Sequence, residues 1–133
     1  MINKQTFKNF LIIREIKIII EEIETLREFI KILHQLEEKR EEEILGISLS
    51  KCKSIEDVEN YQKAIEEKGE LLNNDKTLSR IFKIKNHLYS LEKEAFKRLK
   101  EHLGKLNSNY NQFDLTWIFL KYDDIKKAVE RVK

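Results

Sequence analysis

The sequence contains no proline and only three glycines in 133 residues. Proline breaks helices and glycine weakens them, so a chain with so little of either can keep long helices uninterrupted. The glycines are isolated at positions 46, 69 and 104. Phosphate-binding loops need grouped glycines, because the backbone must approach the phosphates closely. The sequence therefore excludes nucleotide sites of the P-loop and Rossmann kinds.

Cysteine and histidine are also scarce. Cys52 is the single cysteine, so no disulfide can form within the chain, which suits a reducing compartment. The three histidines, His34, His87 and His102, are far apart, and no carboxylate stands three residues before any of them. Zinc sites need clustered ligands, and di-iron bundles need Glu-x-x-His. We therefore expect no metal site, no cofactor and no catalytic residue of these kinds.

Long hydrophobic runs are missing as well. The apolar residues near the N-terminus are interrupted by Arg14, Glu15 and Lys17, so they do not form the core of a signal peptide. No stretch approaches the roughly twenty apolar residues that a membrane span needs. We expect a soluble, cytoplasmic protein without a membrane partner.

Charged residues make up 38% of the chain and apolar residues 41%, a balance typical of long helices and coiled coils. One apolar stripe with alternating spacings of four and three runs through the first forty-five residues. Its members are Ile12, Ile16, Ile19, Ile23, Leu26, Ile30 and Leu33. This pattern predicts one helix over residues 6–45, roughly 60 Å long at about 1.5 Å per residue, with Asn3 or Thr6 as its cap.

Three further helices are predicted over residues 55–72, 76–103 and 114–132. Gly46 and Gly104 are expected to end the helices before them, and Ser54 with Asp57 resembles a capping box. The segment 115–120 is rich in aromatic and β-branched residues and could be a strand, but a lone strand has no partner here. The expected fold is all-α: a single helical domain over residues 1–133, built as an antiparallel bundle of about four helices with coiled-coil-like packing.

A second apolar face interrupts the simple pattern of the first helix. Phe29, Ile32 and Leu36 add to the face that holds Ile30 and Leu33, and a helix that is apolar on two sides is normally buried on two sides. We therefore expect residues 29–36 to lie inside the bundle. The almost entirely polar run at residues 37–43 is expected to be solvated.

The leading functional hypothesis follows from the length of the first helix, which exceeds the width of a compact domain of this size. Its isoleucines are expected to form a seam, a stripe along which helices pack, with a second chain. The seam residues are Ile12, Ile16, Ile19 and Ile23. Isoleucine at both seam positions tends to favour more than two strands in parallel coiled coils, and a dimer stays open as well. The protein is then a non-enzymatic, self-associating interaction or assembly protein.

The charges are distributed unevenly and suggest an alternative. Acidic residues outnumber basic ones in residues 37–70, and the reverse holds in residues 76–105. A cationic stripe is expected along residues 76–100: Lys76, Arg80, Lys83, Lys93, Lys97 and Lys100. It can be solvated, can face the acidic segment, can bind an acidic protein partner, or can follow a nucleic-acid backbone. The last option suggests a nucleic-acid-binding accessory subunit, and small helical subunits of CRISPR effector complexes are similar in size and composition.

A third hypothesis concerns Arg27 and His34, which are separated by six residues. This spacing resembles the motif of HEPN ribonucleases, small four-helix enzymes in which an arginine precedes a histidine by four to six intervening residues. The resemblance covers eight residues, and Arg98 with His102 departs from the pattern. It implies that the arginine neutralises a phosphate while the histidine moves a proton. The alternative is that both residues flank the apolar stripe of a structural helix.

Overall fold

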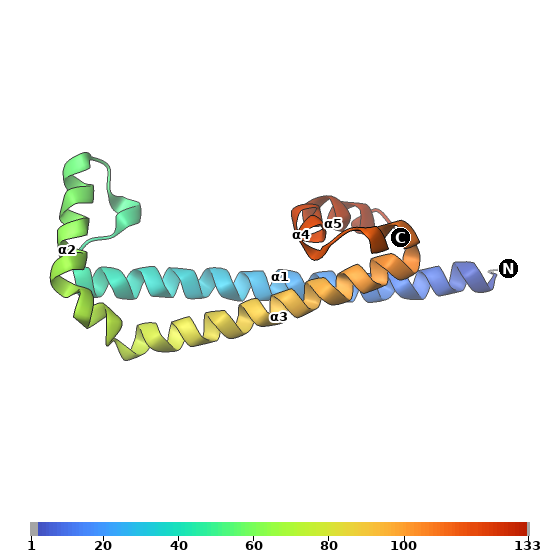
Figure 1. Cartoon of the computed structure of the whole chain (residues 1–133), viewed down its shortest axis with the longest axis horizontal. Helices are drawn as coiled ribbons and strands as arrows, with labels where there is room; N and C mark the ends of the chain where they lie inside the picture. The colour runs from blue at the N-terminus through green and yellow to red at the C-terminus, as the bar shows by residue number, and fades with distance from the viewer. Residues whose placement is uncertain (1–2, 133) are drawn as a thin grey trace. The chain divides into compact units, whose positions relative to one another are not determined.

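The computed structural model of the chain describes residues 3–132, and every regular element within them is a helix. The helices labelled in Figure 1 are α1 (Lys4–Leu45), α2 (Ile55–Asn73), α3 (Lys76–Leu106), α4 (Leu115–Leu120) and α5 (Tyr122–Glu130). Two 3₁₀ turns, η1 (Leu49–Lys51) and η2 (Ser108–Gln112), lie in the connections. The predictions of an all-α fold and of a long N-terminal helix are confirmed.

Local signals fix both ends of α1. The Asn3 side chain accepts a hydrogen bond from the Thr6 backbone N–H at 2.7 Å, so Asn3 is the cap. At the other end Gly46 adopts a positive φ of 77°, and its N–H donates to the Glu42 carbonyl at 2.7 Å. Glycine takes this left-handed conformation at little cost. The 42 residues between are one continuous helix, as predicted.

The C-terminal segment is helical, so the alternative of a strand over residues 115–120 is wrong. Asp114 caps α4 by accepting from the Trp117 N–H at 2.9 Å. The prediction of one continuous helix over residues 114–132 is also wrong, because Lys121 leaves helical geometry (φ −98°, ψ 6°) and separates α4 from α5. The break lets the rings of both Phe119 and Tyr122 lie against Phe96, with centroids 5.4 and 5.3 Å apart.

Gly104 does not end α3, which continues to Leu106. A side chain at this position would collide with the carboxamide of Asn111. Glycine here therefore serves the close approach of the following segment and does not cap the helix. The capping prediction at Ser54 is confirmed, since its hydroxyl accepts from the Asp57 N–H at 3.1 Å.

The chain divides into two compact units. Unit 1 comprises Met1–Arg27 and Ser90–Lys133, and unit 2 comprises Glu28–Tyr89. α1 and α3 each contribute residues to both units, so neither unit ends where a helix ends.

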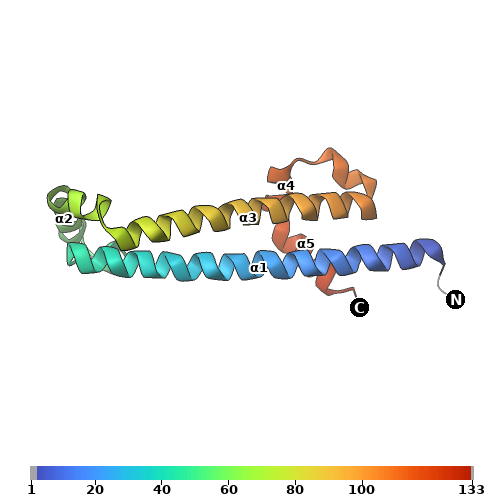
Figure 2. The same ribbon diagram turned by 90° about the horizontal axis from the view of Figure 1, so that it is seen from below.

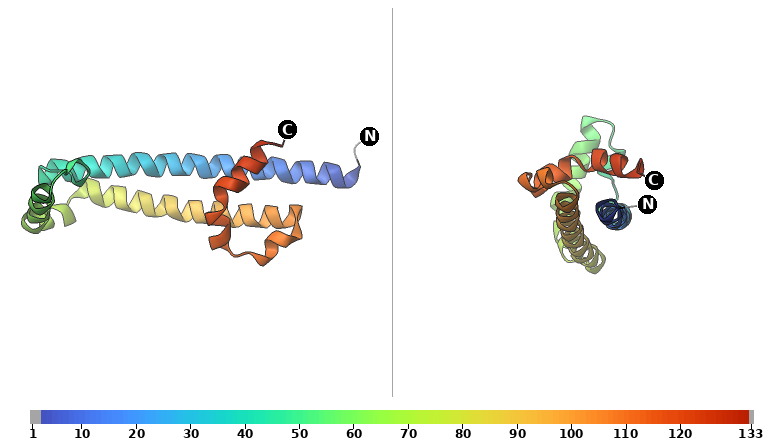
Figure 3. Two further views of the ribbon diagram at one scale, coloured as in Figure 1. Left: turned by 90° about the horizontal axis from the view of Figure 1, so that it is seen from above. Right: turned by 90° about the vertical axis from the view of Figure 1, so that its right-hand side faces the viewer.

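Unit 1 contains the larger core. Figure 3 shows α4 and α5 beside the parts of α1 and α3 that belong to this unit. All four helices contribute to the most deeply buried side chains of this unit. These are Ile16 and Ile23 of α1, Leu99 of α3, Ile118 of α4 and Tyr122 of α5. The whole cluster is Ile12, Ile16, Ile19, Ile20, Ile23, Ala95, Phe96, Leu99, Leu103, Ile118, Tyr122, Ile125 and Val129.

Unit 2 has few buried side chains. Within it, Ile30, Leu45, Ser48 and Ile81 are buried, and α2 contributes none. Figure 2 shows α2 at the ends of α1 and α3 that belong to this unit. The apolar periodicity of α2 predicts that Val58, Tyr61, Ile65 and Leu72 point inward. Val58 and Ile65 are exposed, whereas Tyr61 and Leu72 are partly covered. Polar contacts therefore carry a larger share of the packing here than in unit 1.

Replacement of Ile16 by alanine tests the importance of the unit 1 core. Ile16 is fully buried, whereas Ile18 on the same helix is 50% exposed. Ile16→Ala should lower the free energy of unfolding by about 2 to 5 kcal/mol, because it leaves a cavity. The control Ile18→Ala should change it by less than about 0.5 kcal/mol. Urea denaturation measures both, and equal effects would contradict this core.

Candidate interaction surface

The four predicted seam residues, Ile12, Ile16, Ile19 and Ile23, lie in the core of unit 1. Side chains of α3, α4 and α5 share this core with them. As they are packed in the chain, these isoleucines therefore present no surface to a second copy. Self-association stays a prediction, and it requires another face of α1.

α1 does expose large apolar side chains at other positions. In unit 1 these are Phe7, Phe10, Leu11 and Ile18, all between 42% and 55% exposed. Near the N-terminal end, Phe10 and Ile13 line a shallow hollow together with Arg14, Lys17 and Val132. Lys17 Nζ donates to the Val132 carbonyl at 2.7 Å across this hollow. Phe10, which is 55% exposed, remains in contact with solvent beside it.

In unit 2, α1 exposes a group of three large apolar side chains, Phe29, Ile32 and Leu36, which we call the α1 patch. Their exposed fractions are 54%, 43% and 49%. The prediction that these residues lie inside the bundle is wrong. Ile30, on the other face, is buried, but α2, the additional helix of unit 2, leaves the second face exposed. Contiguous exposed apolar side chains are typical of interaction sites.

The six residues of the predicted cationic stripe are divided between the units. Lys76, Arg80 and Lys83 belong to unit 2, and Lys93, Lys97 and Lys100 belong to unit 1. All are exposed except Lys100, which is partly covered. Lys97 binds Glu94 at 3.2 Å. Among the residues that the structure describes, none of the six forms an ion pair with the acidic segment 37–70, so the solvated interpretation fits them better than internal pairing does.

The charged run at residues 37–43 makes contacts within unit 2 and is not simply solvated. Glu37 binds Lys85 at 3.2 Å. Arg40 donates hydrogen bonds to both carboxylate oxygens of Asp75, and its Nη2 lies 2.6 Å from Asp75 Oδ1. The hydrogen bonds from Arg40 and from the Leu78 N–H lower the pKa of Asp75. Asp75 thus both caps α3 and ties it to α1.

Arg27, the arginine of the HEPN-like spacing, is held at the edge of the unit 1 core. Its guanidinium carbon lies 4.6 Å from the ring centroid of Tyr122 and 5.5 Å from that of Phe96. Its Nε is 3.5 Å from Glu92 Oε2. Arginine over aromatic rings gains cation–π stabilisation. These contacts give Arg27 a structural role in unit 1.

Tyr122 contacts both Arg27 and an acidic residue of α1. Its hydroxyl donates to Glu24 Oε1 at 3.1 Å. Burial and the Glu24 carboxylate raise the pKa of Tyr122.

His34, the histidine of the HEPN-like spacing, belongs to unit 2, where its Nε2 lies 3.0 Å from the Tyr89 hydroxyl.

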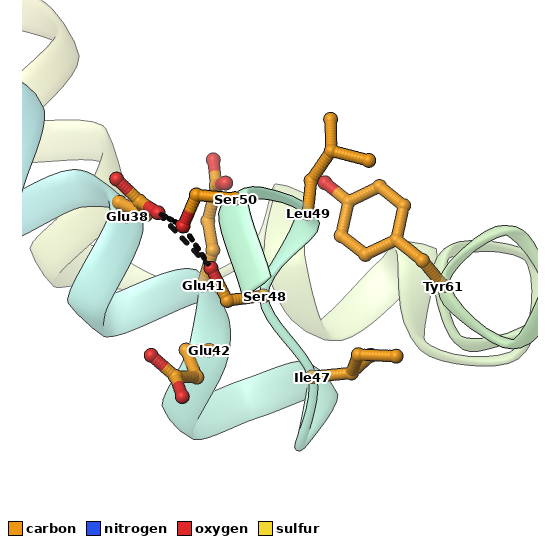
Figure 4. Close-up of a pocket in the computed structure, with 8 residues that line it drawn as sticks. All are labelled: Glu38, Glu41, Glu42, Ile47, Ser48, Leu49, Ser50 and Tyr61. Carbon is orange, nitrogen blue, oxygen red and sulfur yellow. Dashed lines mark hydrogen bonds between the residues drawn. The ribbon is translucent and has the colours of Figure 1, made fainter. Parts of the chain in front are cut away.

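A hollow of about 340 Å³ lies between the last turns of α1, the loop that follows and α2 (Figure 4). Its walls hold the carboxylates of Glu38, Glu41 and Glu42. Ser50 and Ser48 both donate to Glu38 Oε1 and lower its pKa. Burial and Glu37 instead raise the pKa of Glu41. The Glu38 carboxylate therefore accepts its hydrogen bonds from Ser48 and Ser50 of the same chain, and these bonds hold the loop after α1 against the last turns of the helix.

The sequence pattern did not predict that the large apolar side chains of α1 outside the isoleucine face are exposed. Phe29, Ile32 and Leu36 were recognised as a second apolar face, and the error concerned only what covers it. Phe7, Phe10 and Leu11 were not singled out, although their spacing of three and four is a detectable signal of an apolar helix face.

Comparison of the chain with protein-family models, with curated proteins and with solved structures gave no match. In residues 3–132 no group of three or more His, Cys, Asp or Glu side chains is placed to hold a metal ion. None of the described helices has both the length and the apolar character needed to cross a membrane. The candidate sites are therefore the exposed apolar side chains of α1 and the exposed cationic side chains of α3.

The Arg40–Asp75 contact predicts a pH-dependent stability. Because the folded state lowers the pKa of Asp75 below its ordinary value of 3.8, the contact stabilises the fold above that value and is lost as the pH falls further. Asp75→Asn keeps a helix cap but removes the charge, so this variant should be less stable at neutral pH and should lose less stability on acidification.

Urea denaturation between about pH 7 and about pH 2.5 measures the difference. The matched control is Glu66→Gln, which removes an exposed carboxylate from α2 of the same unit. A parallel loss of stability in the wild type and in Asp75→Asn would show that the contact does not form in solution.

Proposed function

We propose that this protein is a non-enzymatic helical interaction protein that associates with itself through exposed apolar side chains of α1. One observation carries the proposal: α1 uses one apolar face in its own core, yet it keeps the α1 patch and the side chains around Phe10 in contact with solvent. Single exposed apolar residues are common, but groups of them are typical of interaction sites. The single cysteine supports a reducing location such as the cytoplasm.

The proposal includes an antiparallel, coiled-coil-like pairing of α1 with α3. Two ion pairs in unit 1 support it. Glu22 binds Arg98 at 2.8 Å, and Arg27 binds Glu92 at 3.5 Å. Moving forward along α1 therefore corresponds to moving backward along α3. In this arrangement the helix pair is a scaffold that presents the remaining faces of α1.

The free energy gained by burying the α1 patch is of the same order as the cost of association. Full burial of a Phe, Leu or Ile side chain gains about 1.5 to 3 kcal/mol. The three members of the α1 patch are each about half exposed, so burying them in two copies gains on the order of 5 to 9 kcal/mol. Association costs about 4 to 15 kcal/mol in lost freedom. The expected assembly is therefore reversible and depends on protein concentration.

Sedimentation equilibrium at micromolar to high micromolar concentration tests self-association. The wild type should exceed the monomer mass of 16.1 kDa, and Ile32→Glu should return it to the monomer, because burying an unpaired carboxylate is unfavourable. The matched control Ile55→Glu changes a still more exposed isoleucine on α2 and should leave the mass unchanged. A wild type that stays monomeric throughout would overturn the proposal.

Nucleic-acid binding is the second candidate function. The observation in its favour is that Lys76, Arg80 and Lys83 in unit 2 are all exposed and, among the described residues, form no ion pairs. Lysine and arginine at such spacings can neutralise phosphates without reading the base sequence. In this alternative the protein is an accessory subunit that binds the nucleic-acid backbone.

Titration of a labelled duplex and a labelled single strand with the protein tests this alternative. Binding should weaken with salt, with a slope in log K of about −0.9 per neutralised phosphate on duplex DNA. Joint reversal by Lys76→Glu, Arg80→Glu and Lys83→Glu should abolish it. Unchanged affinity of this variant, or an absence of binding by the wild type at low salt, would dispose of nucleic-acid binding.

A further inference from the structure

We infer that the partner of the α1 patch is a second copy of this chain, seated antiparallel across Phe29, Ile32 and Leu36. This inference rests on the proposed function, because it specifies the geometry of the proposed self-association. The three side chains are spaced by three and four residues, so at about 100° per residue they fall within an arc of about 60° on α1. They form a narrow strip about two turns long.

Two opposite charges border this strip on the same edge. Glu28 and Lys39 both lie about 80 to 100° from Phe29 around the helix, on the side of Ile32, at about 100° per residue. Both side chains are exposed. Within residues 3–132 neither takes part in any of the ion pairs of α1, which involve Glu22, Glu24, Arg27, Glu37, Arg40, Glu42 and Glu43. The edge is therefore acidic before the patch and basic after it.

This order of charges is self-complementary under a twofold axis. In a twofold interface each residue contacts a partner residue that makes the reciprocal contact. An axis near residues 33 and 34 brings Glu28 opposite the second copy's Lys39 and, at the same time, Lys39 opposite the second copy's Glu28. The same axis lies at the centre of the α1 patch, so apolar side chains meet apolar side chains. A parallel twofold pair would instead place this edge on opposite sides of the seam in the two copies, so Glu28 and Lys39 would not meet.

Charge reversal separates these arrangements. In the full-length chain at low salt, Glu28→Lys or Lys39→Glu alone should weaken self-association roughly tenfold, since each creates two like-charge contacts per dimer. The double variant Glu28→Lys with Lys39→Glu should restore the wild-type dissociation constant. The matched control Lys63→Glu makes the same charge change on α2 of unit 2 and should have no such effect. Sedimentation equilibrium gives the constants, and circular dichroism verifies that each variant is helical.

The outcomes distinguish this inference from the proposed function. If the wild type associates and Ile32→Glu disrupts it, but the single reversals leave the dissociation constant unchanged or lower it, the antiparallel arrangement is overturned while self-association stands. If the wild type is monomeric, both are overturned. Weakening by each single reversal together with restoration by the double variant supports the antiparallel second copy.

Discussion

Burial of the isoleucine face of α1 by the chain's own helices is the constraint on which the rest of unit 1 depends. Ile16 and Ile23 have no exposed surface, and Leu99 and Ile118, from α3 and α4, have none either. Interiors of this kind are close-packed, so the rotation of α1 about its axis is fixed. Once that rotation is fixed, Phe10 and Ile18 have to lie outside. Arg27 closes the edge of the same core through its contacts with Tyr122 and Glu92.

Unit 2 is held together differently. It buries few apolar side chains, and its contacts between helices are largely ionic, from Glu37 to Lys85 and from Arg40 to Asp75. Ion pairs that stay partly solvated contribute little each, and salt screens them. The apolar residues of this unit are consequently less covered than their periodicity suggests. Its exposed side chains, the α1 patch among them, are therefore the ones most able to gain from a partner.

The sequence carried enough information for the helices but not for what covers them. Caps at Asn3, Ser54 and Gly46 depend on groups only a few residues apart, so they could be predicted. The periodicity of Ile12 to Ile23 indicated a buried helix face, and this face is buried. The spacing of such a stripe is the same whether the helices that cover it belong to the same chain or to another one. This explains why the isoleucines were assigned to a second chain and why Phe29, Ile32 and Leu36 were expected to be buried.

Other details depend on contacts between residues distant in the sequence. The break at Lys121 allows Phe119 and Tyr122 to reach Phe96, and the helix passes through Gly104 because Asn111 comes back against it. Neither the contacts of Phe96 nor the close approach of Asn111 can be predicted from the residues next to Lys121 or Gly104 in the sequence. The partners of Glu37 and Arg40 are likewise side chains of α3 or its cap, far along the chain. Their run of charges alone indicated solvent.

The central claim is that α1 has one apolar face buried by its own chain and another that is open to a second copy. Thiol labelling tests it most directly, using Ile16→Cys and Ile32→Cys, each combined with Cys52→Ser so that one thiol is present. The thiol at position 16 should be protected at every protein concentration, because Ile16 is buried within its own chain. The thiol at position 32 should react rapidly in dilute solution and progressively more slowly as the concentration rises. Equally rapid labelling of both positions in dilute solution would contradict the account, because it would mean that the isoleucine face is covered only by another chain.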